Sequence, residues 1–79
     1  MENNIFNVND VDFIGFLDNV DKCRGNVYLE NGNDIYRLNG VLSDMLLKVK
    51  YLNKELGDAI IIFNNSEDLN IIEKFVYKN

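Results

Sequence analysis

The sequence predicts an α+β domain in which three helices cover one face of a small antiparallel sheet, in the order (β)αββαβα. Three observations predict this open-faced sandwich. Apolar residues recur every three or four positions in three segments. β-Branched and aromatic residues cluster in short runs between them. An Asn-Gly pair at Asn31 and Gly32 joins two of these runs as a hairpin. Helices packed on one face of a sheet suit this order.

Length and charge limit the possible functions. The 79 residues are 47% hydrophobic and predict one folded domain over residues 1–79. A net charge of −5 argues against direct binding of nucleic acid or of an anionic membrane, and it permits a protein partner with a basic surface. The sequence has no apolar run of membrane-spanning length and no signal-peptide pattern, so we expect a cytoplasmic protein.

Residue usage also limits the chemistry. The chain has no histidine and one cysteine, Cys23. The commonest metal ligand and general base are therefore missing, and we expect neither a metal site nor a cofactor. Cys23 lies on an apolar stripe near the end of a predicted helix, where a packed, inert thiol is the simpler interpretation.

The first quarter of the chain predicts a strand and a helix. Residues 5–8 alternate as a short strand does. Residues 9–25 have helical periodicity, with Asn9 or Asp10 as the N-cap and Gly25 in the left-handed position beyond the last turn. The residues expected on the buried side of this helix are Phe13, Ile14, Phe16, Leu17, Val20 and Cys23.

Residues 26–38 predict the hairpin, with a type I′ turn at the Asn-Gly pair. A two-residue loop pairs Glu30 with Asn33, and a four-residue loop pairs Glu30 with Ile35. Both loops have even length, so both give the same two faces. The expected core face holds Val27, Leu29, Tyr36 and Leu38, and the opposite face holds Tyr28, Glu30, Ile35 and Arg37.

Residues 38–57 predict the second helix, ended by Gly57. Its start, the stretch RLNGVLSD at residues 37–44, is interpreted as the hinge between hairpin and helix. The apolar stripe expected to face the core comprises Leu42, Met45, Leu46, Val49 and Leu52, and Tyr51 lies off that stripe.

The last part of the chain predicts a strand and a third helix. Residues 59–63 form a β-branched apolar run, typical of a buried strand. Residues 65–79 form the helix, with Asn65 or Ser66 as its N-cap and acidic residues in its first turn. Its inward residues are expected to be Leu69, Ile72, Phe75 and Val76.

The hairpin leading into RLNGVLSD, together with residues 57–76, resembles the HPr-like family of small phosphocarrier proteins, and in particular small clostridial HPr-like proteins. In that family a histidine at the start of the first helix carries phosphate, and a serine that opens the second helix is phosphorylated for regulation. Here residues 7–12 contain no histidine, and the serine position aligns with Gly40, before Ser43. Phosphate transfer through histidine is therefore excluded.

We expect a non-enzymatic protein, a regulator or inhibitor that binds a partner through an HPr-like scaffold. The carboxylate pairs lie at helix starts and on polar faces, where capping and solvation explain them, so we expect no catalytic residue. Exposed aromatic residues beside acids are typical of a protein-binding surface. The resemblance implies docking around the first and second helices, at Asp12, Phe16, Ser43, Leu46 and Tyr51.

Two other hypotheses remain open. The first is a phage or mobile-element inhibitor of a host nucleic-acid enzyme, of anti-CRISPR type, whose acids imitate phosphates. The acids concerned are Asp10, Asp12, Asp18, Asp21, Glu67, Asp68 and Glu73. The second is a homodimer formed through the first helix or an exposed sheet edge, because the core of so short a chain is small.

Overall fold

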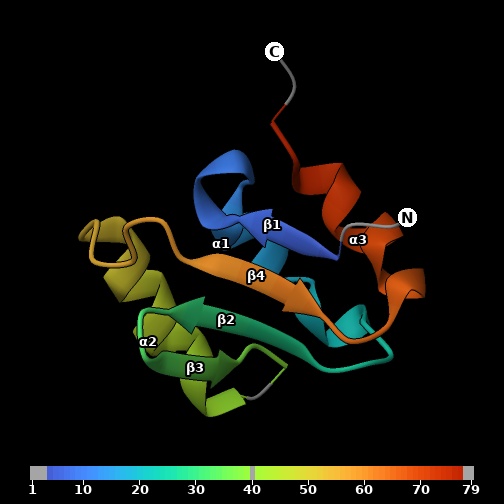
Figure 1. Cartoon of the computed structure of the whole chain (residues 1–79), viewed down its shortest axis with the longest axis horizontal. Helices are drawn as coiled ribbons and strands as arrows, with labels where there is room; N and C mark the ends of the chain where they lie inside the picture. Colours follow the sequence, from blue (N-terminus) through green and yellow to red (C-terminus); the bar gives the residue numbers. More distant parts are fainter. Residues whose placement is uncertain (1–3, 40, 78–79) are drawn as a thin grey trace.

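The fold is α+β in the computed structural model, which describes residues 4–39 and 41–77. The side chains of residues 41–43 lie outside the description. Helices α1 and α2 lie behind the sheet in Figure 1. The order of strands and helices along the chain is the predicted one. The elements are β1 (Ile5–Asn7), α1 (Phe13–Leu17), β2 (Val27–Asn31), β3 (Asp34–Arg37), α2 (Val41–Leu52), β4 (Ile60–Phe63) and α3 (Leu69–Ile72), with 3-10 turns η1 (Val8–Asp10), η2 (Val20–Lys22), η3 (Ser66–Asp68) and η4 (Glu73–Phe75).

The four strands form one antiparallel sheet in the order β1-β4-β2-β3. Strand β4 therefore separates β1 from β2 (Figure 1). Alternate residues of the inner strands point toward the helices and are buried, as the period of two requires. These inward residues are Val27, Leu29, Ile61 and Phe63.

The hairpin has the predicted faces. Its expected core residues are buried or packed against the core, and Ile35 lies on the exposed side. Glu30 pairs with Ile35 and Asn31 with Asp34, so Gly32 and Asn33 form the loop. Gly32 has a φ of 63°, and it is the only hairpin residue with a positive φ. A type I′ turn needs two such residues, so that part of the prediction is wrong.

The hinge before α2 is tied to the start of β2 by one side chain. The Asn39 side-chain amide lies opposite the backbone of Gly25 to Val27. Val27 N–H donates to Asn39 Oδ1 at 2.8 Å, and Asn39 Nδ2 donates to the Gly25 carbonyl at 2.9 Å. These two bonds continue the hairpin ladder with a side chain, which supports the interpretation of this stretch as a structural hinge.

The first helix is shorter than predicted because distant backbone holds its start extended. Asp12 N–H donates to the Phe75 carbonyl at 2.7 Å, and Tyr77 N–H donates to the Asp10 carbonyl at 2.9 Å. Only after this pairing does α1 begin, and Asp12 caps it by accepting the Gly15 N–H at 3.2 Å. The predicted caps, Asn9 and Asp10, are wrong.

The far end of α1 is limited by a competing side chain. Asn19 Nδ2 donates to the Gly15 carbonyl at 2.9 Å, which satisfies an acceptor near the end of the helix. The chain continues as the separate turn η2. Gly25 does not have the predicted left-handed φ. Its small size matters instead, because an added Cβ would lie 2.7 Å from Asn65 Cβ.

Helix α2 ends before Gly57, in a C-terminal motif centred on Lys54. Lys54 has a φ of 61°, and its N–H donates to the Tyr51 carbonyl at 3.0 Å. Glu55 N–H donates to the Lys50 carbonyl at 2.8 Å. This pair of bonds defines a Schellman motif, whose left-handed position is normally glycine. Gly57, with a φ of 54°, lies in the following loop.

Replacing Lys54 with glycine is expected to stabilise the fold. Lys54 is the one non-glycine residue with a positive φ in the described part of the chain, and glycine removes the Cβ strain of that conformation. We expect Lys54→Gly to raise the free energy of unfolding by about 0.5–1 kcal/mol in urea titrations. Lys54→Ala, which keeps the Cβ, is the control. Equal stability of the glycine and alanine variants would contradict the prediction.

The third predicted helix is split into η3, α3 and η4. Asn65 caps this segment as predicted, since its Oδ1 accepts the Glu67 N–H at 3.0 Å. Ile72 is buried, and the other expected inward residues, Leu69, Phe75 and Val76, pack against the core.

Candidate protein-binding surface

Helix α2 turns a row of large apolar side chains toward solvent. Met45 is 73% exposed, Leu46 49%, Val49 47% and Leu52 69%. These four residues, here called the outer face of α2, were predicted to face the core, so that prediction is wrong. The side chain of Leu42, the fifth predicted member, lies outside the described residues. The helical periodicity thus assigned four surface residues, Met45, Leu46, Val49 and Leu52, to the core.

The opposite side of α2 makes the contact with the core. Leu47 is fully buried, and the Tyr51 ring packs on Phe13 with centroids 5.2 Å apart. Burial raises the pKa of Tyr51, and Tyr77 adds to the rise. Because the helix is apolar on both sides, its outer face has the composition of a covered surface rather than a solvated one.

The charges beside the outer face are paired within the chain. Lys48 Nζ lies 2.6 Å from Asp18 Oδ1 and 3.3 Å from Asp44 Oδ2. Lys50 Nζ lies 3.7 Å from Glu55 Oε1. The hydrogen bond to Asp18 is the main cause of the raised pKa of Lys48. These pairs leave the flanks of the helix close to neutral.

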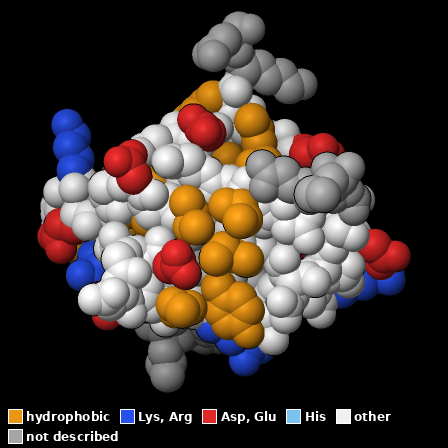
Figure 2. Space-filling view, in the orientation of Figure 1, with side chains coloured by type: hydrophobic (Ala, Val, Ile, Leu, Met, Phe, Trp, Pro, Cys, Tyr) orange, Lys and Arg blue, Asp and Glu red, His pale blue; other side chains and the backbone are white. Residues whose placement is uncertain are grey.

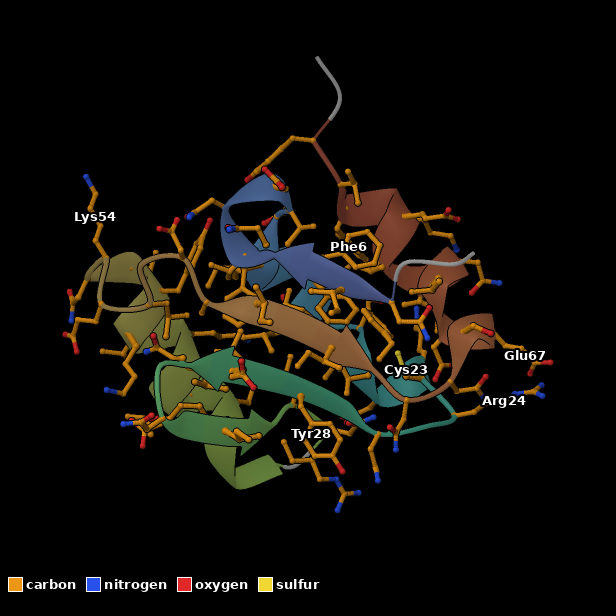
Figure 3. The ribbon with its side chains drawn as sticks, viewed as in Figure 1. Phe6, Cys23, Arg24, Tyr28, Lys54 and Glu67 are labelled. Atoms are coloured by element: carbon orange, nitrogen blue, oxygen red, sulfur yellow. The ribbon has the colours of Figure 1, made fainter. Side chains whose placement is uncertain are left out.

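A groove of about 530 Å³ adjoins the C-terminal end of this face. Leu52 belongs both to the outer face and to the groove wall. Asn9 Nδ2 donates to the Gly57 carbonyl at 2.9 Å, and both residues belong to the groove lining. Lys54 projects away from the body of the molecule beside it (Figure 3). The groove is lined by Val8, Asn9, Tyr51, Leu52, Lys54, Leu56, Gly57 and Asp58.

The five predicted partner-binding residues do not form one surface. Phe16 is fully buried, so its assignment to the surface is corrected. Asp12 is exposed and caps α1, and Tyr51 is only partly exposed. Leu46 lies on the outer face of α2. The side chain of Ser43 lies outside the described residues.

Phe16 is buried because it joins several core elements. Its ring packs on Phe63 of β4 at 5.8 Å and on Phe75 of η4 at 6.2 Å between centroids. The sequence pattern places several apolar residues on a broad face of the first helix, and it does not indicate which phenylalanine packs at the centre of the core.

The acids that were predicted to form one surface do not all lie at the surface. Asp68 is 2% exposed and accepts the N–H groups of Arg24 and Gly25, so it is not a surface charge. Asp18 is exposed but paired with Lys48. Figure 2 shows the acids on the sheet side of the molecule as separate groups around an apolar centre. The predicted acids that are exposed are Asp10, Asp12, Asp18, Asp21, Glu67 and Glu73.

Cys23 has the properties of a packed thiol. It is half-buried against the core, and burial, followed by the charges of Asp68 and Asp21, raises its pKa to about 11. The thiol is therefore protonated at neutral pH, and the reactive thiolate is scarce.

Residues 4–39 and 41–77 hold no group of three or more cysteine, aspartate or glutamate side chains placed to bind a metal ion. In the same residues, no helix has both the length and the apolar character needed to cross a membrane.

Comparison with known proteins finds no matching family model, no similar curated protein and no similar solved structure. The resemblance to the HPr-like family therefore stays a prediction from the residue pattern. Function is inferred from the geometry of the chain itself.

Proposed function

We propose that this protein is a non-enzymatic regulator or inhibitor that binds a protein partner through the outer face of α2. One observation carries the proposal. Four large apolar side chains point to solvent from a helix whose other side is already packed. Surface helices normally turn polar residues outward, and exposed apolar patches mark interaction sites.

The spacing of these residues suggests the mode of binding. Met45, Val49 and Leu52 occupy positions i, i+4 and i+7 of the helix, the spacing of anchors that enter an apolar groove on a partner. The partner proposed here is a protein with such a groove. Leu46 flanks the row and widens the contact.

In the proposed binding, the apolar residues of α2 and the acidic residues of the chain have different roles. The acids nearest the outer face, Asp44 and Glu55, are paired with lysines, so apolar contact supplies most of the affinity at the site itself. The net charge of −5 acts at longer range and favours a partner with a basic periphery. Association is then faster at low ionic strength.

The scaffold of this regulator is proposed to be HPr-like but without phosphocarrier chemistry. The chain has no histidine, and the N-terminus of α1 is occupied by the Asp12 carboxylate, which accepts the Gly15 N–H. A carboxylate at that position repels a phosphoryl group. This supports a binding role rather than group transfer.

The test compares capture of a partner by three tagged forms of the protein. Val49→Asp places a charge in the outer face, and Asn70→Asp adds the same charge on α3, where Asn70 is exposed. We expect the wild type and Asn70→Asp to capture the same dominant protein from the cells that encode the chain. We expect Val49→Asp to bind that purified protein at least about tenfold more weakly.

Circular dichroism of each variant checks that the fold is kept. A photo-cross-linker at Val49 should join the captured protein, and one at Asn70 should not. Equal affinity of Val49→Asp and wild type would remove the outer face of α2 as the binding surface. Catalytic turnover in a screen of phosphoryl and acyl substrates would overturn the non-enzymatic role.

A further inference from the structure

The sheet face turned away from the helices holds two cross-strand rows of side chains. The first row is Ile5, Ile62, Tyr28 and Arg37, and the second is Asn7, Ile60, Glu30 and Ile35. These eight residues are here called the open face. Because residues of one strand alternate between sides, all eight project from the same side of the sheet.

The open face is apolar where a solvated sheet face is normally polar. Ile35 is 64% exposed and Ile5 46%, and Tyr28, Ile60 and Ile62 are half-buried beside them. Figure 2 shows a band of apolar side chains across the middle of this side of the molecule, and in Figure 3 Tyr28 lies at the front of the sheet. Antiparallel sheets with one free side usually alternate apolar and polar residues.

The charges of the open face are self-complementary. It carries one acid, Glu30, and one base, Arg37, at neighbouring positions of the two rows. The face is therefore neutral on a chain whose net charge is −5. Two copies of this chain repel each other over most of their surfaces, and a neutral face is where that repulsion is weakest.

We propose that the open face binds the open face of a second copy of this chain. In this dimer a two-fold axis lies between the two sheets, parallel to them and perpendicular to the strands. It places Ile62 of one copy over Ile60 of the second copy. The same axis places Arg37 beside Glu30 of the second copy, and the symmetry repeats that pair. Each copy thus supplies one charge to each of two symmetry-related pairs around an isoleucine centre.

The size of the face sets the strength expected of this dimer. Four strands spaced about 4.8 Å apart present a face about 20 Å across, which is smaller than a standard interface and suits a weak, transient contact. The dissociation constant is then expected to be on the order of 100 µM, and the dimer depends on concentration. This inference does not rest on the binding role proposed for α2, which uses other residues.

The first test measures mass by light scattering and sedimentation over about 1 µM to 1 mM. The wild type is expected to shift from monomer to dimer, and Ile35→Asp to stay monomeric. Asn70→Asp, with the same added charge on α3, should dimerise as the wild type does. Thermal unfolding checks that each variant is folded.

The second test uses the charge pair. Glu30→Arg gives a face with two bases, and Arg37→Glu gives a face with two acids. Each variant alone should dimerise about tenfold more weakly than wild type, because both symmetry-related pairs become repulsive. An equimolar mixture should form a heterodimer of near wild-type strength, because every pair is then attractive.

Three results would overturn the proposal. The first is a monomeric wild type across the whole concentration range. The second is a dimer that Val49→Asp disrupts and Ile35→Asp does not, which would assign self-association to α2. The third is a mixture of the two charge variants that dimerises no better than either alone. A failure of partner capture by α2 changes none of these readings.

Discussion

Leu47→Ala is expected to lower the free energy of unfolding by about 3 kcal/mol, whereas Leu46→Ala changes it by less than about 0.5 kcal/mol. The two residues are adjacent and identical in type, but Leu47 is fully buried and Leu46 is 49% exposed. Truncating Leu47 removes packed methyl groups and leaves a cavity. Truncating Leu46 mainly removes surface that water already contacts.

Urea unfolding of the two variants measures this difference directly. A domain of this size is stabilised by only a few kcal/mol, so Leu47→Ala should be largely unfolded at temperatures where Leu46→Ala is intact. The opposite order of stabilities would mean that α2 is rotated about its axis. The outer face of α2 would then be core, and the binding surface proposed on it would be lost.

Asp68→Ala is expected to cost about 3 kcal/mol, and Asp68→Asn about half of that. Both carboxylate oxygens of this buried residue are used. Oδ1 accepts the Arg24 N–H at 2.9 Å, and Oδ2 accepts the Gly25 N–H at 2.8 Å. Alanine leaves both donors unsatisfied. Asparagine keeps one acceptor but turns an NH₂ group toward the other donor.

Glu67→Ala is the matched control, because Glu67 is the preceding acid and is exposed. It should change stability by less than about 0.5 kcal/mol. If Asp68→Ala were as stable as the control, the loop at Arg24 and Gly25 would not depend on Asp68 for its docking. Hydrogen exchange at the two amides gives a second measurement, with faster exchange expected in Asp68→Ala.

The strands and the hairpin faces could be predicted from the sequence because their signals are local. Alternation with a period of two assigned Val27 and Leu29 to the core and Tyr28 to the opposite side. The prediction did not depend on the register, since both even loop lengths give the same faces. The turn type failed because the loop begins at Gly32 rather than at Asn31.

The rotation of α2 could not be predicted from periodicity. Apolar residues occupy both sides of the helix, including adjacent Leu46 and Leu47. Either side satisfies a helical spacing, and the larger apolar set predicts the exposed side of the helix as the core side. The side that is buried is set by tertiary contacts, such as the Tyr51 ring on Phe13, which the sequence does not display.

Two other errors have a common physical cause in long-range hydrogen bonds. The extended start of α1 depends on the pairing of Asp12 with Phe75. Asp68 is buried because its partners lie 44 and 43 residues away along the chain. From the local pattern, Asp12 and Asp68 are both expected to be ordinary acidic residues at the start of a helix. Only the folded chain gives them different roles.

The position of β4 in the sheet has a consequence for folding during synthesis. Strand β1 is made first, but its neighbour in the sheet is β4, at Ile60–Phe63. Until those residues leave the ribosome, the hairpin of β2 and β3 is the only strand pair of this sheet that can form. The nascent chain therefore carries an unpaired β1 until β4 has been synthesised, and closure of the sheet is a late, non-local step. A ribosome-bound chain ending before Ile60 should bind a chaperone that the completed domain does not.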